Sequence, residues 1–157
     1  METSPAHDTA TLDVSGGYAY LREQGTDSPV NIYNKGWVVE VTQRIGWVGF
    51  VGELGASYRL DSVGARQSLY GFLGGVRFRV IRVAGLNFFA QALVGQERFS
   101  APGFNEHGAA FQPGAGIDVP LVKKMGVRVQ GDYRIAQENL VNYQEFRLTA
   151  GVVVGIR

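Results

Sequence analysis

The sequence predicts an all-β fold in which eight antiparallel strands close into a single up-and-down barrel. Polar and apolar residues alternate at period two over most of the chain, turn residues interrupt this alternation at intervals, and no long stretch has a helical period. A length of 157 residues suits one domain. The strands are expected at residues 12–22, 36–44, 48–59, 67–79, 86–98, 108–119, 126–137 and 145–157.

The barrel accounts for nearly the whole chain. Residues 1–11 are polar and small and contain Pro5, so we expect a flexible N-terminal tail there, followed by a barrel domain over 12–157. Pro113 falls within a predicted strand, where it removes a backbone donor. We therefore expect a local bulge at Pro113 and Gly114.

Composition excludes several classes of protein. No run of eighteen apolar residues is present, which excludes a transmembrane helix. The net charge is +1 and the basic residues do not cluster, so no nucleic-acid partner is expected. The absence of cysteine excludes disulfides and thiolate metal sites. We expect no cofactor and no metal.

The alternation divides each strand between a polar and an apolar face. We expect the polar face to line the interior and to form a packed network. Its predicted members are Glu40, Glu53, Arg77, Gln91, Gln112, Asp118, Arg128, Gln130, Asp132, Arg134 and Arg147.

Three features favour an outward apolar face. The lysines, Lys35, Lys123 and Lys124, all lie in connections, whereas a soluble barrel usually carries lysine on its outer face. Small residues accompany the arginines on the polar face, as a narrow, filled lumen requires. Aromatic residues lie toward strand ends, as in an interfacial girdle: Tyr18, Tyr20, Trp37, Trp47, Tyr58, Tyr70, Phe78 and Phe146. The predicted fold is thus an eight-stranded antiparallel up-and-down transmembrane β-barrel.

The connections differ between the two ends of the predicted barrel. Those at 45–47, 80–85 and 120–125 are short, whereas those at 23–35 and 99–107 are polar and longer. Alternate connections of an up-and-down barrel lie at the same end. Short periplasmic turns and longer external loops are typical of outer-membrane barrels.

With the strands placed, four segments carry a resemblance to a known family: VSGGYAYLR, YGFLGGVRFRV, GAGIDVPLVKKMGVRVQGDYRI and FRLTAGVVVGIR. The chain resembles, over about 12–157, the bacterial outer-membrane β-barrels related to outer-membrane protein A. The resemblance implies a monomer in the outer membrane of the cell envelope, in contact with lipid and inserted by the barrel-assembly machinery. No basic and apolar leader follows Met1, so we expect a mature form in which Met1 replaces a signal peptide.

Two glutamates define a hypothesis about the interior. The short turn at 45–47 places Glu40 opposite a residue near Glu53, and opposed like charges destabilise a sheet. We therefore expect Arg77, Arg128 and Arg134 to neutralise both carboxylates. Such a network favours a plug that fills the lumen over an ion gate, because eight strands leave little open space.

The expected function is a structural, envelope or surface-interaction role without catalysis. Two alternatives are a soluble up-and-down barrel that binds a small apolar ligand inside and a lipid-modifying outer-membrane enzyme. The second would use His107, with Glu106 and Ser100 in the same predicted loop, but no catalytic motif surrounds them. Minor conductance through a transiently opened lumen is a third possibility.

Overall fold

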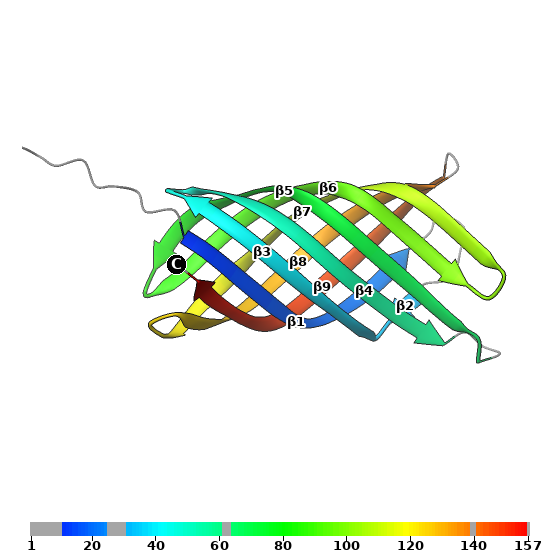
Figure 1. The fold of residues 1–157 in the computed structure, drawn as a ribbon, viewed down its shortest axis with the longest axis horizontal. Helices are drawn as coiled ribbons and strands as arrows, with labels where there is room; N and C mark the ends of the chain where they lie inside the picture. The colour runs from blue at the N-terminus through cyan, green and yellow to red at the C-terminus, as the bar shows by residue number, and fades with distance from the viewer. Residues whose placement is uncertain (1–10, 25–30, 61–63, 139–140, 157) are drawn as a thin grey trace, which may run out of the picture.

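The fold is an all-β barrel, seen here in a computed structural model that describes residues 11–24, 31–60, 64–138 and 141–156 (Figure 1). Its strands are β1 (Thr11–Gln24), β2 (Asn31–Tyr33), β3 (Lys35–Ile45), β4 (Val48–Leu60), β5 (Arg66–Val83), β6 (Leu86–Ala101), β7 (Phe104–Val122), β8 (Met125–Glu138) and β9 (Val141–Ile156). The predicted tail at 1–11 lies outside the described residues except for Thr11, which belongs to β1.

The sheet closes on itself. β1 and β3 to β9 pair antiparallel in chain order, and β1 also pairs with β9. The closed sheet is staggered by ten residues. Starting at Val14 of β1 and stepping from each residue to its ladder partner on the next strand, the path returns to β1 at Gln24. This stagger tilts the strands by about 40° to the barrel axis, as membrane-spanning barrels require. The predicted eight-stranded up-and-down barrel is confirmed, with β2 as a short extra strand on β1.

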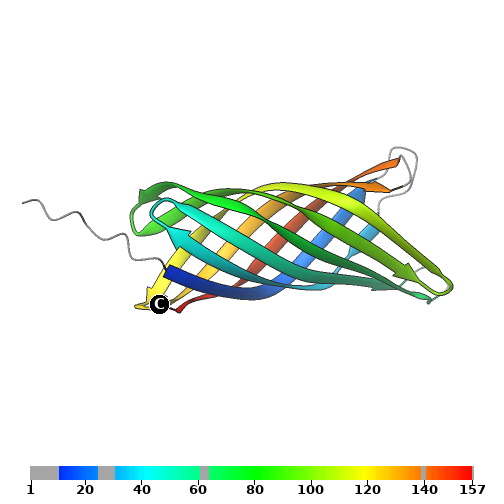
Figure 2. The same ribbon diagram turned by 45° about the horizontal axis from the view of Figure 1, so that its top comes forward.

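The two ends of the barrel differ less than the sequence suggested. Two-residue turns join β3 to β4, β5 to β6 and β7 to β8 at the end that holds the start of β1 and the C-terminus (Figures 1 and 2). We call this the turn end and the opposite one the loop end. The long loop predicted at 99–107 is wrong, because β6 and β7 extend to a turn at Pro102 and Gly103. Gly103 has a φ of 77°, which lets so short a turn form.

The bulge predicted at Pro113 and Gly114 is also wrong. Pro113 pairs in register with Ala92 of β6, and the ladder to β8 resumes at Gly114 without a register shift. The register shifts lie instead between Arg79 and Ile81 and between Pro120 and Val122. Both are near the turn end.

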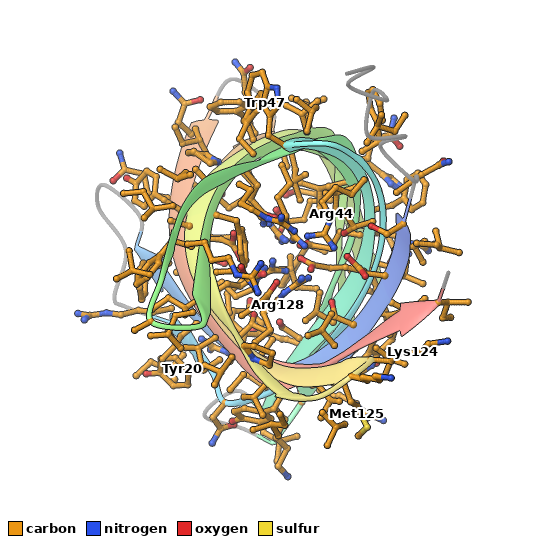
Figure 3. All side chains as sticks on the ribbon, turned by 90° about the vertical axis from the view of Figure 1, so that its left-hand side faces the viewer. Tyr20, Arg44, Trp47, Lys124, Met125 and Arg128 are labelled. Atoms are coloured by element: carbon orange, nitrogen blue, oxygen red, sulfur yellow. The ribbon has the colours of Figure 1, made fainter. Side chains whose placement is uncertain are left out.

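The wall places its apolar face outward. Phe72 is 70% exposed and Val94 is 59% exposed, whereas charged side chains such as Glu40 and Arg147 are buried. Figure 3 looks into the turn end, with Arg44 and Arg128 inside the ring and Trp47 and Tyr20 outside it. This arrangement is the reverse of that needed by a soluble barrel with an apolar lumen.

The interior is not uniformly polar, which corrects the prediction of a packed polar lumen. Val51, Leu73, Leu93 and Ala110 form a buried apolar layer inside the barrel. A second cluster nearer the loop end contains Leu21, Tyr33 and Leu69, with Phe99 packed against it. A filled lumen needs volume as well as paired charge, and these side chains supply volume where the ionic groups do not reach.

Candidate functional site

The interior ion network has its first centre at Glu40. Its carboxylate accepts hydrogen bonds from Arg77 Nη2 at 2.8 Å, Arg128 Nη1 at 2.9 Å and Gln130 Nε2 at 2.9 Å. Ser15 Oγ donates a further bond at 3.2 Å. Glu40 is 2% exposed, so this fully bonded shell is what allows an ionised carboxylate to remain inside the wall.

Arg147 forms the second centre. Its guanidinium makes a bidentate pair with Glu53, with Nη1 at 2.7 Å from Oε1 and Nη2 at 2.6 Å from Oε2. Nη2 also lies 2.7 Å from Asp132 Oδ2. All three side chains are buried, and the planar fork of arginine suits such a double carboxylate contact.

Glutamine amides join the two centres. Gln130 Nε2 donates both to Glu40 and, at 3.0 Å, to Asp132. Gln91 Nε2 donates to Asp132 at 2.9 Å while its Oε1 accepts from Arg77. Neutral amides therefore link the carboxylates through donated hydrogen bonds without adding charge.

Toward the turn end, Arg128 connects the network to a partly exposed acid. It makes a bidentate pair with Asp118, at 2.6 and 2.9 Å, as well as its bond to Glu40. The guanidinium carbons of Arg128 and Arg77 lie 5.0 and 4.3 Å from the ring centroid of Phe89. Phe89 thus contributes an aromatic face to the two cations, a role that the sequence analysis missed.

The predicted partners of the two glutamates require one correction. Glu40 and Glu53 are directly opposed in the β3–β4 ladder, and Arg77 and Arg128 lie against Glu40. For Glu53, however, the predicted Arg134 lies at 3.5 Å and the short contacts come from Arg147 of the last strand. Arg134 instead donates from Nε to Gln112 Oε1 at 2.8 Å.

A chamber opens at the loop end above this network. Its volume is about 320 Å³. It is lined by Glu23, Tyr33, Arg59, Gln67, Leu69, Glu97, Phe99, Glu106, Ala136, Tyr143 and Glu145. This site was not predicted, although Glu145 shares the inward face with Arg147 two residues later and Glu97 shares it with Gln91.

The outer surface at the loop end carries the opposite charge. We call Lys35, Tyr58, Arg66, Tyr70 and Arg98 the basic belt. Its three cations are exposed, the Arg66 guanidinium lies 5.1 Å from the Tyr58 ring centroid, and Tyr58 meets Tyr70 edge-on at 6.1 Å. Every carboxylate whose side chain the structure describes faces the interior, so the belt is positive without neighbouring acids on the outer face.

The predicted interfacial aromatics all lie on the outer side of the wall. At the turn end, Trp47 packs on Phe78 with ring centroids 5.6 Å apart. Tyr18 lies at the middle of β1. The others lie in the loop-side halves of their strands: Tyr20, Trp37, Tyr58, Tyr70 and Phe146.

The residues considered for catalysis do not come together. They lie in β6 and β7 rather than in a loop. Glu106 lines the interior chamber, whereas His107 is exposed and pairs in the outer wall with Arg98. In a Ser/His/acid mechanism the acid must orient the histidine. Glu106 cannot orient His107, because the two side chains lie on opposite faces of the sheet.

Comparison with solved structures places this geometry among known proteins. Neisserial surface protein A superposes with a TM-score of 0.77 at 13% identity, covering 91% of this chain and 96% of that one. This chain has the eight-stranded outer-membrane barrel fold. The attachment invasion locus protein Ail of Yersinia pestis matches with a TM-score of 0.55 at 19% identity, over 92% of this chain and 98% of Ail.

The N-terminal barrel domain of Pseudomonas aeruginosa OprF gives a TM-score of 0.57 at 11% identity, over 94% of this chain and all of that one. No family model and no curated protein sequence matches the chain. At these identities the likeness concerns the fold of the barrel.

Proposed function

We propose that the chain is an integral protein of the bacterial outer membrane with a structural, envelope or surface-interaction role. The observation that carries the proposal is the distribution of charge across the wall. The acids whose side chains the structure describes face inward, while large apolar side chains such as Phe50, Phe72 and Val94 are more than half exposed on the outside. An apolar band around a closed barrel with satisfied backbone groups suits a bilayer, not water.

The interior acts as a plug in this proposal. Arg77 and Arg128 bond to Glu40, and Arg147 bonds to Glu53, so these hydrogen bonds join strands that are not neighbours in the sheet. Opening a water path would separate several buried ion pairs at once, each costly to break. This supports a closed barrel rather than a conducting one, and we infer a monomeric protein inserted by the assembly machinery.

The basic belt supports an orientation in which the loop end faces the cell exterior and the belt contacts lipid head groups. Lys35, Arg66 and Arg98 lie beside tyrosines at one end of the apolar band, where an anionic membrane surface would meet them. An outer groove of about 620 Å³ brings Lys35 and Arg66 together with the apolar side chains of Ile32 and Leu60. Cations beside apolar groups suit an amphiphile with a negatively charged head.

The proposal predicts a depth-dependent cost for charge on the outer wall. Val94→Arg, at the middle of β6, is expected to lower the free energy of unfolding in lipid vesicles by about 2–4 kcal/mol. Ser100→Arg, on the same face near the loop end, is the matched control and should cost only about 0–1 kcal/mol. Denaturant titration followed by gel mobility measures both. Equal small costs would mean that this wall does not contact the bilayer core.

A further inference from the structure

We propose that the loop-end chamber binds a small organic cation that carries ammonium or guanidinium groups. This inference goes beyond the placement of the barrel in a membrane and does not depend on it. It rests on the side chains of Glu97 and Glu145, which line the chamber, and on the shape and charge of the space before them.

Glu97 and Glu145 lack the hydrogen bonds that the other buried acids have. They are 1% and 2% exposed. Within the described part of the chain, both carboxylate oxygens of Glu97 and Oε2 of Glu145 have no hydrogen-bond partner. Glu40, with comparable burial, accepts from four side chains. Buried acceptors normally find donors, so this carboxylate pair is incomplete without a further group.

Arg134 does not supply the missing donors. Arg134 Nη1 lies 3.6 Å from Glu97 Oε1 and 3.7 Å from Glu145 Oε2, beyond hydrogen-bond distance. Arg134 Nε is already committed to Gln112, and Nη2 lies 3.5 Å from Glu53. One Arg134 nitrogen is thus divided between Glu97 and Glu145 at distances beyond hydrogen bonding, while Glu53 has Arg147 as its closer partner. The carboxylates of Glu97 and Glu145 therefore lack a full set of N–H donors.

The chamber has room for a ligand that carries the missing charge. Its volume of about 320 Å³ falls in the range of small-molecule sites. Its lining contains four glutamates and one arginine, together with the rings of Tyr33, Phe99 and Tyr143. Carboxylates bind N–H donors strongly, and aromatic rings accept both cations and methylene stems. The lining therefore matches an alkyl ammonium or guanidinium compound.

A metal ion fits this site less well. Among the residues that the structure describes, no group of three or more histidines, cysteines, aspartates or glutamates is arranged to hold one. Divalent calcium takes six to eight oxygen ligands at short distances, which a pair of carboxylates does not provide. An organic cation can instead satisfy Glu97 and Glu145 with separate N–H bonds and leave Arg134 in place.

Agmatine, which carries a guanidinium and an ammonium on a butyl stem, is a suitable probe. We expect saturable binding to the refolded full chain in zwitterionic detergent by isothermal titration calorimetry. Glu97→Gln keeps the shape of the side chain but removes its charge, and should weaken binding by about tenfold or more. Asp13→Asn, at the turn end beside Arg44, is the matched control and should bind agmatine as the unmodified chain does.

Three results would overturn the proposal: no binding of agmatine, equal affinity in Glu97→Gln and the unmodified chain, or displacement of agmatine by equimolar calcium chloride. Heat-dependent gel migration establishes that each variant is folded. If Glu97→Gln fails to fold, amide NMR of the unmodified chain decides the matter. Agmatine should shift the signals of Glu97, Phe99 and Glu145 and leave that of Asp13 unchanged, and the opposite pattern would place binding elsewhere.

Discussion

Arg147→Ala should lower the free energy of unfolding by about 3–5 kcal/mol, because it removes the closest cation from two buried carboxylates, Glu53 and Asp132. Arg147 is 3% exposed and bonds to both oxygens of Glu53 and to Asp132. Gln91, Gln112 and Gln130 cannot compensate, since they are neutral. The variant must therefore protonate an acid, admit water or lose structure.

Arg44→Ala is the matched control for this prediction. Arg44 makes one short ion pair, with Asp13 at 2.6 Å, and its side chain is 26% exposed at the turn end. Solvent can replace that interaction, so the expected cost is about 0–1 kcal/mol. Urea titration of both variants in detergent micelles measures the difference. Similar costs for the two arginines would show that the interior network does not stabilise the barrel.

Gly95→Ala should destabilise the barrel by about 3 kcal/mol or prevent its folding, because the added methyl group meets backbone. An ideal Cβ at Gly95 overlaps the carbonyl oxygen of Phe72 and lies 2.7 Å from Leu73 Cα. Both atoms belong to β5, which pairs with Gly95 in the ladder. Relief requires β5 and β6 to separate, whereas a clash with a flexible side chain could relax locally.

Gly52→Ala provides the control with the same chemical change. Gly52 faces outward from β4, and a Cβ there meets no atom within 4 Å. Alanine is favoured over glycine in a strand, so this variant should be unchanged or more stable by up to about 1 kcal/mol. Refolding yield by gel mobility compares the two. Normal refolding of Gly95→Ala would mean that β5 and β6 do not approach as closely as this account requires.

Period-two alternation predicted the barrel because each strand has one lipid-side and one lumen-side face. It also placed Glu40 opposite a residue near Glu53, and the two-residue turn at Gly46 and Trp47 makes Glu53 itself the partner. Alternation shows which face of a strand a residue lies on, but not its position along the barrel axis. The ten-residue stagger decides which strands meet across the lumen, so the contact between Arg147 and Glu53 could not be read from sequence.

Other features were missed because residues were assigned to faces by polarity. Leu73 and Leu93 are apolar, yet they occupy inward positions of their strands and fill the lumen beside glycines. The two-residue turn at Pro102 and Gly103 was not predicted, because the residues on both sides of it are polar and were assigned to a loop. These residues belong to β6 and β7, which extend past the apolar band. Such strand extensions create the wall of the loop-end chamber.

The central claim is that the apolar face of the wall points outward into lipid. Its most direct test is to refold the purified chain with and without detergent and to compare far-UV circular dichroism and heat-dependent gel migration. The account predicts a β-sheet spectrum and a band that shifts on boiling only when detergent is present. A folded, monodisperse species in plain buffer would contradict it.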